Sequence, residues 1–185
     1  VPFHSAEGYI TRLVSKGYKV AICEQVEDPK LAKGLVKREV VRIVTPGTNC
    51  NLEALDESKN NYLMGVVAMD DLFGISVVDV TTGEYRLTEV DGLGKLLDEI
   101  NKFMPSELIC NESFYISGVD VEDLKERLGI SISSLAPHYF DQECCKKSLC
   151  RHFSVQTLDG LGLADYSVGI TAAGAVMEYL EETQK

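Results

Sequence analysis

Three acidic residues end or follow apolar, strand-like runs and are the best candidates for metal-assisted chemistry in this chain. Asp70 and Asp79 end two successive runs, and Glu112 follows a later one. Carboxylates drawn from several strands can hold two Mg²⁺ ions that stabilise the attacking and leaving oxygens of a nuclease reaction. Each residue also has a structural explanation, since Asp70-Asp71 and the Thr-Thr-Gly-Glu after Asp79 are turn sequences. The structural interpretation is favoured, and a metal-dependent nuclease remains the alternative.

Other catalytic or cofactor motifs are incomplete. The segment 92–95, GLGK, resembles the end of a phosphate-binding loop, but Leu96 replaces the required Ser or Thr and Glu89 replaces the first glycine. The three histidines have no Ser or Cys partner at a diagnostic spacing. The sequence therefore predicts no catalytic residue, no cofactor site and no enzyme activity for this chain.

Six cysteines are predicted to be reduced core thiols, since most lie within apolar or helical patterns. The group Cys144, Cys145, Cys150 and His152 is the one candidate for zinc. Its gaps of five and six residues do not place ligands together on a helix, as gaps of three or four would. We therefore expect no metal site there.

A basic cluster lies near the N-terminus of a chain whose net charge is −11. Residues 1–48 carry eight Lys or Arg against five Asp or Glu, whereas residues 49–185 carry ten against twenty-four. Lys30, Lys33, Lys37, Arg38 and Arg42 form a patch suited to phosphate contacts. A solvated edge strand is the alternative interpretation of this cluster. The acidic remainder argues against a wider nucleic-acid surface.

Residue patterns predict an α/β fold in two parts. Before the turn at Pro46-Gly47, a helix and two strands form a β/α piece too small to be stable alone. After a polar linker, the order β-β-β-α-β-α-β-α predicts three antiparallel strands continued by parallel ones, with helices on both faces, which is the ribonuclease-H-like arrangement. The elements are expected at residues 4–16, 18–24, 37–48, 62–69, 73–80, 84–90, 92–104, 106–111, 120–128, 130–135, 141–152 and 164–182.

The last helical pattern, at 164–182, is predicted to have no partner in this chain and to begin a further domain. The chain opens on Val1 rather than Met, so we expect a piece of a longer protein. No apolar run approaches the length of a membrane span, and no signal segment opens the chain. A cytoplasmic protein without membrane contact is expected.

Several motifs carry a resemblance to a known family. Residues 17–29, GYKVAICEQVEDP, and 37–48, KREVVRIVTPGT, resemble the MutS family of bacterial DNA mismatch-recognition proteins. The segments 1–4, VPFH, 79–84, DVTTGE, and 105–108, PSEL, fit the same family. The similarity is dense over residues 1–48 and collinear across the rest.

The resemblance implies a division of the chain. Residues 1–48 would be the C-terminal part of mismatch-binding domain I, and residues 49–60 a linker. Residues 61–160 would be connector domain II, which is catalytically silent, and residues 161–185 the first helix of lever/core domain III. The mismatch wedge and the ATPase domain of the family, which holds ATP and Mg²⁺, have no counterpart here.

The resemblance also implies partners. In the family the connector couples the DNA clamp to the ATPase and docks MutL, while the parent protein, a homodimer, binds mismatched DNA. Lys147 and Ser148 are the candidates for MutL docking, and His4 and Arg38 are the candidates for DNA-backbone contact. DNA binding by this chain alone is expected to be weak or absent.

Overall fold

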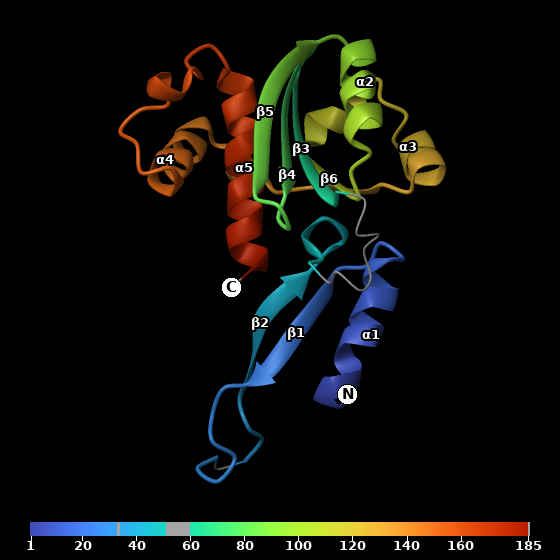
Figure 1. The fold of residues 1–185 in the computed structure, drawn as a ribbon, viewed down its shortest axis with the longest axis vertical. Coiled ribbons are helices and arrows are strands. Elements are labelled where there is room, and N and C mark those ends of the chain that lie inside the picture. The colour runs from blue at the N-terminus through green and yellow to red at the C-terminus, as the bar shows by residue number, and fades with distance from the viewer. Residues whose placement is uncertain (33, 51–59, 185) are drawn as a thin grey trace.

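The structure is a computed structural model that describes residues 1–32, 34–50 and 60–184. For residues 3 and 4 it describes the backbone but not the side chains. Most of the predicted linker at 49–60 therefore lies outside the described residues. Figure 1 shows two parts: a small unit that contains the N-terminus, and a larger unit built on a five-stranded sheet.

The N-terminal unit consists of one helix and a two-stranded antiparallel sheet. Helix α1 (Phe3–Val14) precedes β1 (Val20–Gln25), which pairs with β2 (Arg38–Val44). Most side chains of these strands are exposed, and burial increases only toward the end of β2. This agrees with the prediction that the unit has too few apolar residues for a core of its own.

The larger unit contains a mixed sheet in the order β5-β4-β3-β6-β7. The hairpin partners β3–β4 and β4–β5 are antiparallel, whereas β3–β6 and β6–β7 are parallel. The α/β class and the mixed sheet are therefore confirmed. The apolar run 62–69 forms the central strand, as expected for a strand buried on both faces. The strands are β3 (Tyr62–Met69), β4 (Leu72–Asp79), β5 (Glu84–Asp91), β6 (Glu107–Cys110) and β7 (Ser131–Ser134).

Helices α2 (Leu93–Phe103) and α3 (Val121–Leu128) cover one face of this sheet (Figure 1). Leu96 and Ile100 lie one turn apart on α2 and are fully buried against the sheet. The Asp120 side chain accepts a hydrogen bond from the backbone of Asp123 and so caps the start of α3. The apolar stripe of α2 and the N-terminal cap of α3, both local features of the sequence, therefore explain how these helices form and pack on this face.

Helix α5 (Ser167–Thr183) lies on the opposite face of the sheet, with α4 (Gln142–His152) packed on its outer side (Figure 1). The prediction that this C-terminal helix has no partner in the chain is wrong. Val176 is buried in an apolar cluster shared with the sheet, whereas Ile170 is buried in a separate cluster shared with Leu149 of α4. Every residue from position 168 to position 177 is buried. A helix that is apolar on nearly all sides must be covered on nearly all sides.

Glycines allow α5 to approach the sheet closely. A Cβ on Gly65 of β3 would lie 2.4 Å from Val176 Cγ2, and one on Gly74 of β4 would lie 2.2 Å from the Val168 carbonyl oxygen. Gly174 of α5 similarly accommodates Cys145 of α4, since a Cβ there would lie 2.3 Å from Cys145 Cβ. The close packing of α5 between the sheet and α4 thus depends on glycines at these contact positions.

Candidate functional site

The three carboxylates of the nuclease hypothesis do not converge. In the β3–β4 hairpin Tyr62 pairs with Asp79 at one end, and Asp70 lies in the turn at the other end. Eight-residue strands separate these ends by roughly 25 Å. Glu112 follows β6, which runs parallel to β3, and therefore lies at the Asp70 end, where both side chains are exposed. The structure thus offers no shared metal site for Asp70, Asp79 and Glu112.

Asp79 has a structural role instead. It is fully buried, and its Oδ1 accepts hydrogen bonds from the Thr81 backbone N–H at 2.8 Å and from the Thr81 hydroxyl at 2.6 Å. The Asn61 N–H donates to Oδ2 at 3.3 Å. Asp79 therefore stabilises the turn between β4 and β5, in agreement with the favoured interpretation of the sequence.

The two DNA-backbone candidates lie in the N-terminal unit but are not brought together by any described contact. Arg38 is exposed at the start of β2, opposite Gln25. His4 lies in α1, and its side chain is outside the described part of the chain. Next to Arg38, Lys37 pairs with Glu39, which offsets part of the positive charge of the basic cluster.

The two docking candidates lie on α4. Lys147 is exposed, whereas Ser148 is half-buried. The basic side chains beside them are engaged, since Lys146 pairs with Glu143 and Arg151 pairs with Glu181. Within the described contacts Lys147 forms no ion pair, although its charge acts on the Asp141 carboxylate at the start of this helix.

The cysteines differ from the prediction of core thiols. Cys110 and Cys145 are buried, but Cys23, Cys50 and Cys144 are exposed. Burial raises the pKa of Cys145 to about 12, so this thiol is protonated at neutral pH. Among the described residues, the only three-residue group with metal-ligand geometry contains no cysteine.

A fully buried carboxylate at the start of β6 marks the meeting point of the N-terminal unit and the larger sheet. Glu107 Oε2 accepts hydrogen bonds from the Thr45 hydroxyl and, at 3.0 Å, from the Gly47 N–H. Its Oε1 accepts one from the Tyr179 hydroxyl at 2.6 Å and lies 3.3 Å from Lys19 Nζ. We call Lys19, Thr45, Gly47, Glu107 and Tyr179 the Glu107 joint.

The Glu107 joint satisfies the full hydrogen-bonding capacity of an ionised carboxylate. Such a group has about four lone-pair sites and no donor, and four donors surround Glu107. Lys19 supplies the opposite charge that a buried carboxylate requires. Lys19 precedes β1, Thr45 and Gly47 follow β2, and Tyr179 belongs to α5. The Glu107 side chain therefore links three parts of the chain: the N-terminal unit, the five-stranded sheet and the C-terminal helix α5.

Tyr179 is held as a neutral donor in this joint. Burial raises its pKa above the ordinary value, and the charge of Glu107 and its hydrogen bond raise the pKa further. Lys19 Nζ lies 5.0 Å from the centre of the Tyr179 ring, in the range of a cation–π contact. Lys19 also donates to the Ser133 hydroxyl at 3.1 Å, so that it connects to β7 as well.

The Pro-Gly turn that ends the N-terminal unit is part of this buried contact. It forms the short 3-10 helix η1 (Pro46–Thr48), capped by reciprocal hydrogen bonds between Thr45 and Thr48. A Cβ on Gly47 would lie 2.9 Å from Leu63 Cβ and 3.0 Å from Glu107 Cβ. Glycine is therefore required by the close approach of η1 to β3 and β6.

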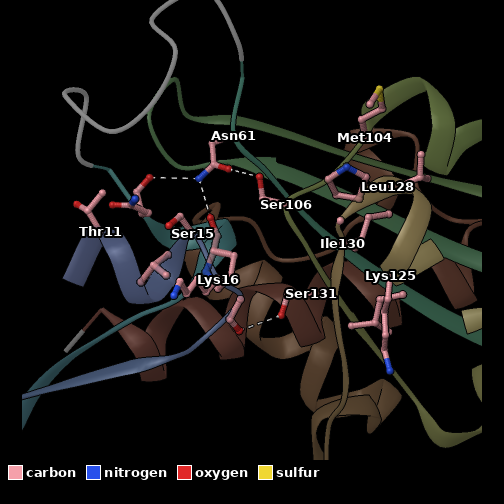
Figure 2. Close-up of a pocket in the computed structure, with 17 residues that line it drawn as sticks. Thr11, Ser15, Lys16, Asn61, Met104, Ser106, Lys125, Leu128, Ile130 and Ser131 are labelled. Carbon is pink, nitrogen blue, oxygen red and sulfur yellow. Dashed lines mark hydrogen bonds between the residues drawn. The ribbon is translucent and has the colours of Figure 1, made fainter. Parts of the chain in front are cut away.

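Asn61 forms a second connection beside the Glu107 joint. Its Nδ2 donates to the carbonyl oxygens of Pro46 at 2.9 Å and Asn49 at 3.2 Å, and its Oδ1 accepts from the Ser106 hydroxyl (Figure 2). A cavity of about 700 Å³ adjoins these bonds. Thr11 and Lys16 line it from the N-terminal unit, and Leu128 and Ser131 from the larger unit. The two units thus meet at a polar contact with an open space beside it.

Comparison with known families agrees with this two-part structure. The family model for MutS domain I matches residues 1–53, and the model for MutS domain II matches residues 61–185. The chain belongs to the MutS family. The MutS domain II match includes α5, which agrees with the packing of that helix on the sheet.

Curated MutS relatives align with the whole chain. "DNA mismatch repair protein MutS" of Lachnoclostridium phytofermentans is 61% identical over 100% of this chain and 20% of the relative. The protein of the same name from Ruminiclostridium cellulolyticum is 48% identical over 100% of this chain and 21% of the relative. The chain therefore spans about a fifth of the length of these MutS proteins.

A solved structure, YeaZ from Pseudomonas aeruginosa, aligns with a TM-score of 0.35 and 8% identity over 51% of this chain and 50% of that chain, which is too weak a likeness to support an argument. Within the part of the MutS chain that the structure describes, no helix combines the length and hydropathy needed to cross a bilayer.

Proposed function

We propose that this chain is a non-catalytic coupling segment of a DNA mismatch-recognition ATPase. The N-terminal unit would be the tail of the mismatch-binding domain, and the five-stranded unit would be the connector. The Glu107 joint is the observation that supports this proposal. It attaches the end of β2 to β6 and α5 through a buried, fully hydrogen-bonded carboxylate. A displacement on the DNA side would therefore act on the connector sheet and on α5 together.

The connector would have the ribonuclease-H-like arrangement without its chemistry. The order β5-β4-β3-β6-β7, with three antiparallel strands followed by parallel ones, supports that assignment. The packing of α5 supports placing the chain as far as Thr183 in the connector, in place of the predicted third domain from residue 161. ATP and Mg²⁺ would belong to another domain of the cytoplasmic, homodimeric parent protein.

The nuclease alternative predicts Mg²⁺-dependent cleavage that Asp79→Asn abolishes. The burial of Asp79 in a turn and its separation from Asp70 and Glu112 support the non-catalytic proposal. Cleavage of labelled DNA or RNA by the purified chain with Mg²⁺, lost in Asp79→Asn, would refute that proposal.

We expect the isolated chain to bind DNA weakly and without mismatch preference. The exposed Arg38 lies in a small basic cluster, but residues 49–185 carry a large excess of acidic side chains. Fluorescence anisotropy with matched and mismatched duplexes at about 0.15 M salt is the appropriate measurement. Tight, mismatch-selective binding would contradict the assignment.

MutL would dock on α4 of the connector, and Lys147→Glu tests this. Reversing the exposed Lys147 charge on α4 should weaken MutL recruitment by a full-length protein containing this chain by about tenfold, which corresponds to about 1.4 kcal/mol. Mismatch binding should be unchanged, since α4 lies on the outer side of α5. A pull-down with MutL, and DNA binding in parallel, measure both effects.

A matched control for this experiment is Lys95→Glu. Lys95 is an exposed lysine of α2, on the opposite face of the sheet, and its replacement changes the net charge equally. It should leave MutL recruitment unchanged. If Lys147→Glu recruits MutL as well as the parent protein does, α4 is not the docking surface.

A further inference from the structure

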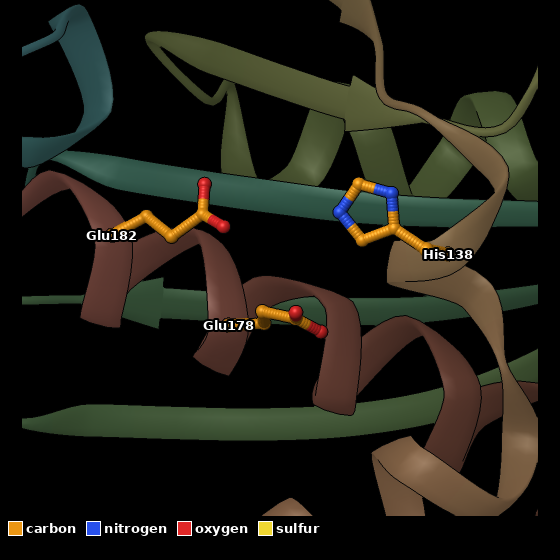
Figure 3. Close-up of side chains that lie close together, drawn as sticks. All are labelled: His138, Glu178 and Glu182. Carbon is orange, nitrogen blue, oxygen red and sulfur yellow. The ribbon is translucent and has the colours of Figure 1, made fainter.

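A histidine and two glutamates lie close together at the outer side of the C-terminal helix. One ligand atom from each of His138, Glu178 and Glu182 lies within 4.8 Å of the others. Figure 3 shows the imidazole directed toward the two carboxylates, which project from successive turns of one helix. No sequence motif indicates this group, because His138 is 40 residues from Glu178.

Two elements fix the positions of these side chains. Glu178 and Glu182 are four residues apart on α5 and therefore share one face of the helix. His138 belongs to the short 3-10 helix η3 (Pro137–Phe140), whose buried Tyr139 packs in the cluster beneath α5. The hydroxyl of Tyr139 donates to Glu182, so that η3 is already attached to α5 beside the three candidate ligands.

The charges at this place are unbalanced. Two carboxylates one turn apart repel each other, and no described lysine or arginine forms an ion pair with Glu178 or Glu182, although Glu181 between them pairs with Arg151. A bound cation would neutralise the repulsion.

We propose that His138, Glu178 and Glu182 form a binding site for a divalent transition-metal ion. One imidazole nitrogen and two carboxylate oxygens are a donor set that suits Zn²⁺ and also Co²⁺ or Ni²⁺. Mg²⁺ and Ca²⁺ prefer ligand sets made of oxygen alone and fit this group less well. Water would complete the coordination, since His138 and Glu182 are exposed.

Such an ion would connect η3 to α5 just before α4 begins. Asp141 directly follows η3 and caps α4 by accepting a hydrogen bond from the Cys144 N–H at 2.8 Å. The metal would therefore fix the start of the helix that carries Lys147. This role is structural and independent of whether α4 docks a partner.

Cobalt titration of the purified 185-residue chain, followed by its absorption spectrum, tests the site. We expect one Co²⁺ ion per chain, visible d–d bands, and no near-ultraviolet thiolate band, because the ligands are nitrogen and oxygen. Zinc should displace the cobalt, since it binds such sites more tightly. Binding at thiols, revealed by a thiolate band that Cys144→Ser removes, would overturn the proposal.

Variants assign the ligands. Glu178→Gln and His138→Asn should each weaken Co²⁺ binding by at least about tenfold, since loss of even an outer-shell partner costs tenfold or more. Glu181→Gln, which removes the glutamate paired with Arg151 on the same helix, should leave it unchanged. Unchanged affinity in both ligand variants would also overturn the proposal.

Thermal unfolding gives an independent readout. Zinc at about one hundred times its dissociation constant should raise the Tm of the parent chain by about 5 °C or more, and should not raise that of Glu178→Gln. An equal rise in both proteins would place the bound zinc elsewhere on the chain.

Discussion

Glu107→Ala should lower the free energy of unfolding by about 3–5 kcal/mol, because each buried donor that is left without an acceptor costs about 1–3 kcal/mol. The variant leaves the Lys19 ammonium, two hydroxyls and the Gly47 N–H without their common acceptor. Urea denaturation followed by circular dichroism measures the loss. Because whole domains are stable by only about 5–15 kcal/mol, this is a large fraction of the total.

The loss should be concentrated at the junction of the two units. Hydrogen exchange should increase first in β1 and β2, which have few other buried contacts, and least in β3 and β4. Glu107→Gln keeps the shape and one acceptor oxygen, and should cost less than alanine. Glu126→Ala, at an exposed position of α3, should change stability by less than about 0.5 kcal/mol. Equal stability of Glu107→Ala and Glu126→Ala would refute the role of the joint.

Gly74→Ala should destabilise the five-stranded unit by about 3 kcal/mol or more, because the added methyl group cannot be accommodated. A Cβ there would lie 2.2 Å from the Val168 carbonyl oxygen and 2.7 Å from the Gly169 nitrogen, which are backbone atoms of α5. To remove this clash, α5 would have to move away from β4, or β4 would have to bend. Thermal denaturation of the purified variant measures the cost.

Two further glycines provide a graded comparison. Gly169→Ala should have an intermediate effect, since its Cβ would lie 3.1 Å from the Thr88 carbonyl oxygen. Gly94→Ala should be neutral or slightly stabilising, since Gly94 lies on α2 with nothing within 4 Å of the added Cβ. If all three variants have the same stability, the close approach of α5 does not govern the fold. A Gly74→Ala chain that fails to fold while Gly169→Ala folds supports the argument.

Local patterns predicted the elements of this fold closely. The apolar run 62–69 became the central strand within the same bounds, and the helix predicted at 120–128 became Val121–Leu128. These predictions succeeded because strand alternation, helical stripes and caps arise from neighbours in the chain. The family motifs at 17–29 and 37–48 likewise identified the MutS family from the sequence alone.

The nuclease alternative could have been weakened and one error avoided from the sequence. A hairpin that turns at Asp70 places Asp79 at its far end, which disfavours a metal site shared by these carboxylates. The helix predicted without a partner is rich in small and apolar residues on all sides, which itself indicates burial.

The contacts of the two candidate sites were decided by the tertiary structure. Glu107 looked like one polar residue at the start of a short strand, yet its partners come from positions 19, 45, 47 and 179. His138 meets Glu178 and Glu182 only because η3 packs on α5. The sequence by itself determined the elements and the family, because both are recorded in short stretches of residues. The tertiary structure decided which charges meet, because a buried carboxylate takes its partners from whatever packing brings within hydrogen-bonding distance.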